Sequence, residues 1–240
     1  MVTVSEHEGV RYLHLDTPWV QGAMRKSRPQ DLELEYVRRM MTALLWRPTE
    51  ALREGHAVQL GLGAAALTRY CHDRLGLRTT AVELNPAVIR ACRMCFHLPA
   101  DGTRLQVLCE DAGHWIAQPA QRGSIDLLQV DLYDHEAAAH VLDDAGFYAA
   151  CHASLADQGV MAVNLFGRHS SFDRSAGFMA QAFGRDQLWR VQATREGNTV
   201  VIGTRGVVVP SREVLVDRAQ HLERHLGLPA LRWLRMIRPL

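Results

Sequence analysis

Three carboxylates and a tyrosine follow directly on the apolar run 125–130 (IDLLQV). They are Asp131, Tyr133, Asp134 and Glu136. The apolar run predicts a strand that is buried on both faces. Acids at the end of such a strand lie where burial and neighbouring charges shift pKa values, as acid–base catalysis requires. This cluster is therefore the strongest candidate for chemistry, and the alternative is a solvated acidic loop that caps the next helix.

A second motif lies upstream, where a short apolar strand at 57–60 runs into the turn 61–66 (GLGAAA). Gly61 and Gly63 let the backbone pass close under a ligand and then begin a helix. Glu83 follows Gly63 by 20 residues, at the end of the next predicted strand. At this offset an acid can accept two hydrogen bonds from a ribose. The motif predicts a nucleoside site, and a tight turn without any ligand is the alternative.

A third predicted strand, 104–108, delivers Asp111 to the following turn. An acid at the carboxyl end of a third parallel strand can reach the ligand crevice of an open sheet. Asp111 could therefore accept a hydrogen bond from an exocyclic amine such as that of adenine. A helix N-cap has the same sequence signature, so both interpretations stay open.

The remaining elements must position these side chains. Apolar runs predict a fifth strand at 160–165 and a closing antiparallel pair at 188–193 and 199–203. Helices are expected at about 65–75, 85–96, 143–155, 172–183 and 211–226. The basic residues of the C-terminal tail, which are Arg232, Arg235 and Arg238, indicate a solvated surface or an oligomer contact.

The N-terminal segment precedes the nucleoside motif. Residues 1–16 alternate on both sides of a polar turn, as a small hairpin does, and a basic loop follows at 25–29. A helix from about 29 or 31 to 45 carries Tyr36 on its apolar stripe. This segment could form a lid or a rim over the site, or serve only as a capping hairpin and helix.

Composition excludes several classes of function. The chain has 240 residues, 48% of them hydrophobic, and a net charge of +1, which favours neither nucleic acid nor an acidic partner. Five cysteines without regular spacing indicate reduced thiols in the cytoplasm. Cys92 and Cys95 have C-x-x-C spacing inside a predicted helix, so two ordinary helix cysteines are favoured over a redox dithiol or a zinc site. Since no apolar run could cross a bilayer and no leader is present, we expect a cytoplasmic protein that needs no metal.

Five ordered motifs together resemble the spermidine synthase family of polyamine aminopropyltransferases. They are VQLGLGAAALT, TTAVELNPAVI, LQVLCEDAGHW, IDLLQVDLYDHEA and LADQGVMAVNLF, and the similarity runs from about residue 21 to 165. The resemblance implies an α/β, Rossmann-like class I methyltransferase fold. We expect a mainly parallel seven-stranded sheet with helices on both faces, in a catalytic domain at 29–240 behind a β-hairpin and basic loop at 1–28.

The resemblance also implies an activity and a role for each candidate residue. The family transfers an aminopropyl group from decarboxylated S-adenosylmethionine to a small-molecule amine, and its members are often homodimers. Asp131 matches the acid thought to take the proton from the attacking amine, and Asp134 matches the acid that helps hold the acceptor. Glu83 matches the ribose acid, and Asp111 the acid that reads the adenine amine. Residues expected near the donor and acceptor are Gln21, Tyr36 and Tyr133.

The sequence departs from the family pattern at three positions. Ala64 stands where the glycine turn normally carries an aspartate that faces the aminopropyl tail of the donor. Val37 replaces a His or Gln beside the tyrosine, and His135 replaces the proline after the second aspartate. Because Ala64 would permit intact S-adenosylmethionine, a methyltransferase is one alternative. A non-catalytic nucleoside-binding relative is the other.

Overall fold

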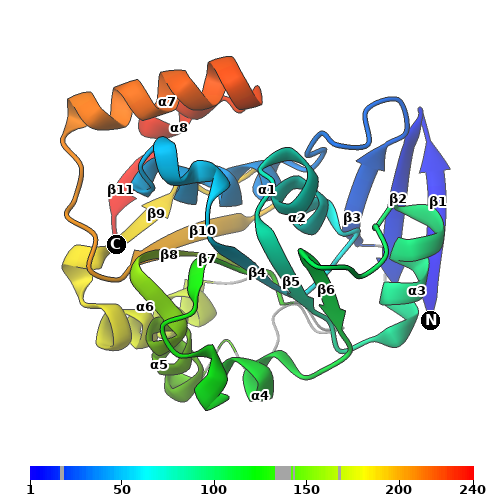
Figure 1. Cartoon of the computed structure of the whole chain (residues 1–240), viewed down its shortest axis with the longest axis horizontal. Helices are drawn as coiled ribbons and strands as arrows, with labels where there is room; N and C mark the ends of the chain where they lie inside the picture. The colour runs from blue at the N-terminus through cyan, green and yellow to red at the C-terminus, as the bar shows by residue number, and fades with distance from the viewer. Residues whose placement is uncertain (17–18, 133–141, 143, 167–168) are drawn as a thin grey trace.

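The structure, a computed structural model, describes residues 1–16, 19–132, 142, 144–166 and 169–240. Within these residues the large sheet has eight strands in the order β11-β9-β10-β8-β7-β4-β5-β6 (Figure 1). Strands β6, β5, β4, β7 and β8 pair in parallel, and β10, β9 and β11 continue the sheet antiparallel. The bounds are β4 (His56–Leu60), β5 (Arg78–Val82), β6 (Leu105–Leu108), β7 (Ile125–Val130), β8 (Leu155–Phe166), β9 (Leu188–Val191), β10 (Asn198–Thr204) and β11 (Ile237–Pro239).

Helices cover both faces of this sheet, because successive strand residues point to opposite sides. Leu127 of β7 packs toward the first face and its neighbour Leu128 toward the second. The first face is covered by α1 (Glu35–Met40), the 3₁₀ helix Met41–Trp46, α2 (Ala66–Arg69), the π-helical turn Tyr70–Arg74, α7 (Arg212–Leu226) and α8 (Ala230–Leu234). The second is covered by α4 (Ala112–Ile116), α5 (Ala145–Ser154) and α6 (His169–Phe183). Short 3₁₀ turns are Glu50–Arg53, Pro119–Gln121 and Arg185–Gln187.

The N-terminal segment forms a small antiparallel sheet of three strands, β1 (Val2–His7), β2 (Val10–Leu15) and β3 (Val20–Arg25). Its first two strands are the predicted hairpin. Glu8 and Gly9 both have positive φ, 49° and 75°, as a tight two-residue hairpin turn requires. The third strand was not predicted. This sheet packs with α3 (Pro86–Cys95) beside β5 and β6 at the edge of the large sheet (Figure 1). The proposed domain boundary after residue 28 stays a prediction.

The predicted fold class is confirmed, with one strand more than expected. The tail that was interpreted as solvated surface forms α8 and β11, although the side chains of Arg232, Arg235 and Arg238 are exposed. The helix expected from 29 or 31 begins only at Glu35, because the carbonyls of residues 32 and 33 accept hydrogen bonds from the Arg38 side chain. No helix among the described residues is long and apolar enough to cross a membrane.

Candidate functional site

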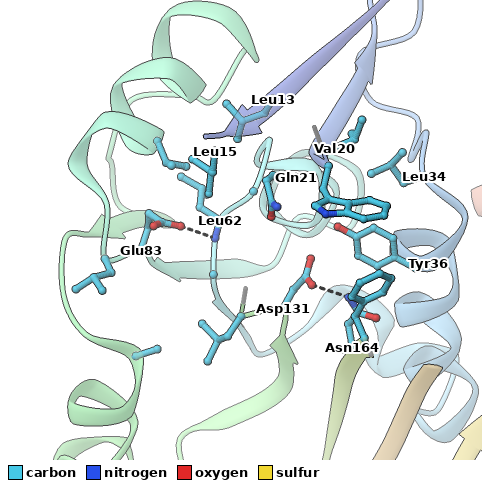
Figure 2. A pocket seen from close by; sticks show the side chains of 18 of the residues that line it. Leu13, Leu15, Val20, Gln21, Leu34, Tyr36, Leu62, Glu83, Asp131 and Asn164 are labelled. Atoms are coloured by element: carbon cyan, nitrogen blue, oxygen red, sulfur yellow. Dashed lines mark hydrogen bonds between the residues drawn. The ribbon is translucent and has the colours of Figure 1, made fainter. Parts of the chain in front are cut away.

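A pocket of about 600 Å³ lies at the carboxyl ends of the parallel strands, under the N-terminal sheet. It brings together seven residues that the sequence predicted: Gln21, Tyr36, Gly61, Gly63, Glu83, Asp111 and Asp131. Figure 2 shows Glu83 on one side of the glycine turn and Asp131 on the other. The remaining three candidates, Tyr133, Asp134 and Glu136, lie outside the described residues. The predicted acids and glycines thus share one hollow.

Backbone geometry explains the residue types in the glycine turn. Gly61 and Gly63 have φ values of +89° and +50°, a region that L side chains rarely adopt. A Cβ on Gly61 would collide with the carbonyl oxygen of Asp131, and one on Gly63 would lie 2.9 Å from the carbonyl oxygen of Gln21. The turn is therefore packed between the end of β7 and the start of β3. Ala65 also has positive φ, 57°, which is uncommon for a residue with a Cβ.

Glu83 is tied to the turn by main-chain hydrogen bonds. Its Oε2 accepts from the N–H of Leu62 at 3.1 Å, and its Oε1 accepts from the N–H of Asn85 at 2.8 Å. Burial raises the pKa of Glu83, and the hydrogen bonds from the main chain oppose that rise. A carboxylate has about four lone-pair positions, so Glu83 keeps acceptor capacity for a ligand hydroxyl beside its main-chain donors.

Asp111 caps a helix and lines the pocket at the same time. Its Oδ1 accepts from the N–H of His114 at 2.8 Å, which is the N-cap hydrogen bond of α4. The side chain is exposed at the end of β6, among the pocket-lining residues. The two interpretations made from the sequence are therefore compatible, because one carboxylate oxygen suffices for the cap.

Asp131 accepts hydrogen bonds from two other side chains that line the pocket. Asn164 Nδ2 on β8 donates to Asp131 Oδ1 at 2.9 Å, and the Tyr36 hydroxyl forms a second side-chain hydrogen bond. Burial raises the pKa of Asp131, and these two hydrogen bonds oppose the rise. Burial and the nearby Asp131 likewise raise the pKa of Tyr36, so the phenol stays protonated as a donor. A carboxylate with a raised pKa can accept a proton from a nucleophile in the pocket.

Comparison with known proteins identifies the family. No family model matches the chain. A polyamine aminopropyltransferase of Neisseria meningitidis serogroup A is 30% identical over 95% of this chain and 85% of the relative. The chain belongs to the polyamine aminopropyltransferase family. A polyamine aminopropyltransferase of Chromobacterium violaceum is 29% identical over the same shares of the two proteins.

Solved structures share the fold of this family member. A probable spermidine synthase from Corynebacterium glutamicum has a TM-score of 0.78 at 19% identity, with 95% of this chain and 85% of that chain covered. Human methyltransferase-like protein 13 in complex with SAH has a TM-score of 0.72 at 21% sequence identity, with 81% of this chain and 93% of that chain covered. A spermidine synthase in complex with the transition state analogue AdoDATO has a TM-score of 0.62 at 15% sequence identity, with 95% of this chain and 88% of that chain covered. The class I methyltransferase fold predicted from the motifs is confirmed.

Sequence reasoning missed one wall of the aminopropyltransferase pocket. This wall consists of Asn164 and Phe166 at the end of β8, Glu196 and Asn198 from the β9–β10 hairpin, and Trp19 before β3. The rings of Trp19 and Phe166 meet edge to face with centroids 6.2 Å apart. A polar Asn164 at the carboxyl end of an apolar strand was the available signal. Glu196 and Asn198 are ordinary turn residues in the sequence and gave no signal of a place in the pocket.

Cys92 of the C-x-x-C pair supports the turn. Cys92 is buried, and its Sγ donates to the carbonyl oxygen of Gly63 at 3.0 Å. Burial raises the pKa of Cys92 to about 12, so the thiolate that redox chemistry needs is disfavoured. In the described part of the chain, no group of three or more His, Cys, Asp or Glu side chains could hold a metal ion.

Proposed function

We propose that this chain transfers an aminopropyl group from decarboxylated S-adenosylmethionine to a polyamine-type amine. One observation carries the proposal: the glycine turn and Glu83 line the same pocket as Asp131 with its two hydrogen-bonding partners. A nucleoside-binding motif and a perturbed general base in one hollow fit a transfer between a nucleoside sulfonium and a nucleophile. Membership of the polyamine aminopropyltransferase family supports the same reaction.

The donor would bind over the turn. We assign the ribose hydroxyls to Glu83, whose carboxylate keeps acceptor capacity beside its main-chain donors. The adenine amine is assigned to Asp111, through the oxygen that the helix cap does not use. Gly61 and Gly63 allow close approach of the backbone, and Gln21 covers the turn from β3.

The chemical step would use Asp131 as general base. An alkylammonium has a pKa of about 10.4, so it must lose a proton before it can attack. The amine proton passes to Asp131, and the nitrogen lone pair forms a bond to the methylene carbon next to the sulfonium. The carbon–sulfur bond breaks with its electrons on sulfur, which leaves methylthioadenosine as a neutral product. Holding the amine and the sulfonium in line supplies much of the remaining acceleration.

The acceptor would extend from Asp131 toward β10. Neighbouring strands lie about 4.8 Å apart, so the step from β7 over β8 to β10 covers about 10 Å. This distance suits the alkyl chain of a diamine. Glu196 offers a carboxylate to a second ammonium group, and Trp19 and Phe166 offer aromatic surface to the methylenes. By family resemblance, Tyr133 and Asp134 belong to the same acceptor site.

The Asp131→Asn variant tests the proposal. Asparagine keeps the size and polarity of the side chain but cannot take a proton. We expect calorimetry to give a dissociation constant for methylthioadenosine within about threefold of the wild type, and turnover with putrescine and decarboxylated donor to fall by about 10³-fold. Loss of nucleoside binding in Asp131→Asn would contradict its role as base. Absence of turnover in the wild type on any amine would favour the non-catalytic alternative.

A methyltransferase that uses intact S-adenosylmethionine is the second candidate. By the family resemblance, Ala64 offers no carboxylate that could repel the carboxylate of the intact donor, but its side chain does not line the pocket. The likeness to methyltransferase-like protein 13 shows that the fold also occurs in that class. Titration of the wild type with both donors separates the candidates, since tighter binding of the carboxylated donor is expected only for methyl transfer.

We also propose that the protein works in the cytoplasm and as a homodimer. All five cysteines are free thiols, as a reducing compartment favours. The dimer is carried over from the family resemblance alone. Size-exclusion chromatography with light scattering would test it, and a monomer at micromolar concentration would contradict it.

A further inference from the structure

Two consecutive hydrogen bonds connect the β9–β10 hairpin to Asp131. Asn198, the first residue of β10, donates from Nδ2 to Asn164 Oδ1 at 3.2 Å. Asn164 in turn donates from Nδ2 to Asp131 Oδ1 at 2.9 Å. All three residues line the pocket, and both amides are more than 90% buried. The base is therefore attached to a polar chain that crosses from β10 over β8 to β7.

The chain has a defined direction. An asparagine amide can present either its oxygen or its NH₂ group to a neighbour, and only its partners decide which. Because Asn198 donates to Asn164 Oδ1, the NH₂ group of Asn164 must face Asp131. With the opposite orientation, Asn164 would place an oxygen against the carboxylate, and two acceptors would oppose each other in a buried site.

The hairpin anchors the outer end of the chain. The N–H of Asn198 donates to Thr194 Oγ1 at 3.2 Å, and the N–H of Thr194 donates to the carbonyl oxygen of Asn198 at 2.8 Å. These bonds hold the Asn198 backbone in place before its side chain reaches Asn164. Glu196 lies between the two anchored residues, so the same turn carries one wall of the pocket.

We propose that Asn164 and Asn198 are positioning residues for Asp131. Asn198 sets the orientation of the Asn164 amide, and Asn164 holds Oδ1 of Asp131, which together with the Tyr36 hydroxyl fixes how the carboxylate faces the attacking amine. The inference rests on the proposed function for its catalytic meaning. The hydrogen-bonded arrangement itself is independent of that function.

The first test measures the pH dependence of kcat for the wild type, Asn164→Leu and Asn198→Leu. Leucine has the same branching and the same number of side-chain non-hydrogen atoms as asparagine, and it cannot donate a hydrogen bond. Loss of a hydrogen bond to a charged group moves the acid limb by about one pH unit or more. We expect this limb to move to higher pH in Asn164→Leu, and by a smaller amount in Asn198→Leu. Misplacement of the base should also lower the plateau kcat by about 10- to 100-fold, with the KM of the donor unchanged.

Two further variants separate positioning from a general loss of structure. Thr204→Val removes a buried hydrogen bond, Thr204 Oγ1 to Gln187 Oε1, from the other end of β10. This control should lower stability without moving the acid limb. Asn164→Gln keeps the amide and should lie closer to the wild type than Asn164→Leu. Equal pH profiles for Asn164→Gln and Asn164→Leu, or an unmoved limb in Asn164→Leu, would overturn the proposal.

A second measurement does not depend on turnover. The carboxyl carbon of Asp131 can be followed by NMR in protein labelled at aspartate, with the signal assigned by its absence in Asp131→Asn. Among the described residues, the titratable groups that line the pocket with Asp131 are Tyr36, Glu83, Asp111 and Glu196, and they are the same in every variant. We expect Asp131 to titrate at higher pH in Asn164→Leu than in the wild type. An inactive wild type would refute the proposed function, whereas an unchanged titration would refute the positioning role.

Discussion

Gly22 of β3 lies directly against Ala64 of the glycine turn, so closely that a Cβ on Gly22 would be 2.5 Å from the Cβ of Ala64. Real Cβ atoms do not approach a neighbouring carbon to this distance, and Ala64 has no flexible side chain that could move aside. The N-terminal sheet is therefore in close contact with the turn. The sequence left open a lid or a rim over the site and a mere capping hairpin and helix; the sheet forms part of the rim, because Leu13, Leu15, Val20 and Gln21 line the pocket.

Replacement of Gly22 by alanine should be costly. We expect Gly22→Ala to lower the free energy of unfolding by about 1–3 kcal/mol, since overpacking forces the strand or the turn to shift. Donor affinity should fall with it, because Gln21 and Gly63 move apart. Urea denaturation and calorimetry measure both effects. Gly102→Ala is the matched control, since Gly102 has open space around it, and equal stability of the two variants would show that the contact is not rigid.

The Ala64→Asp variant tests whether the side chain at position 64 faces the tail of the donor. Ala64 is 2% exposed and is not among the residues that line the pocket. We therefore expect the new carboxylate to be buried without a partner and to cost about 3–5 kcal/mol, the usual cost of an uncompensated charge. The loss of stability should grow as the pH rises and the carboxylate ionises. Thermal melts of Ala64→Asp and Ala64→Ser would measure it. A stable Ala64→Asp protein that prefers the decarboxylated donor would instead place this side chain in the pocket.

Asp131 should weaken the fold at neutral pH. Burial raises its pKa in the folded state, so the stability that this group contributes is fully present below its ordinary pKa and is lost as the pH rises through the raised value. An asparagine at position 131 does not ionise, so its contribution to stability does not fall as the pH rises. The melting temperature of Asp131→Asn relative to the wild type should therefore increase from pH 4 upward and then level off. Asp217→Asn, at an exposed position of α7, is the control variant. A difference in melting temperature between Asp131→Asn and the wild type that falls as the pH rises would contradict this account.

Asp111→Asn separates the two roles of that side chain. Asparagine is an equally good N-cap, so the stability of α4 should change by no more than a few tenths of a kcal/mol. Its NH₂ group, however, would face the amine of adenine with a donor. We expect the affinity for methylthioadenosine to fall about tenfold and the affinity for the 6-oxo purine analogue to rise. Calorimetry with both nucleosides measures this, and an unchanged ratio of affinities would remove Asp111 from base recognition.

The parallel half of the site could be predicted from the sequence because of its topology. Gly61, Glu83, Asp111 and Asp131 each follow a strand closely, and the carboxyl ends of parallel strands meet at one edge of the sheet. Gln21 precedes this part of the chain, and its place in the pocket came from the family resemblance alone.

The antiparallel half could not be predicted in the same way. Asn164 and Asn198 are 34 residues apart and meet only because β10 pairs with β8. Local sequence carries no information about that register. Strand β3 was missed for a local reason, since Gly22 interrupts the alternation of apolar and polar residues that indicates a strand. Strand β11 contains Pro239 and Arg238, which resemble a polar tail, but proline is tolerated on an edge strand.

Strand β11 has a practical consequence for handling the protein. It pairs with β9 along Trp189, Arg190 and Val191, and the N–H of Leu240 donates to the carbonyl oxygen of Leu188 at 3.1 Å. If residues 236–240 were trimmed or forced out by a fused partner, β9 would present a row of unpaired peptide groups beside buried Trp189. Such an edge recruits strands from other chains, so shortened versions should aggregate during expression even though the catalytic pocket is untouched.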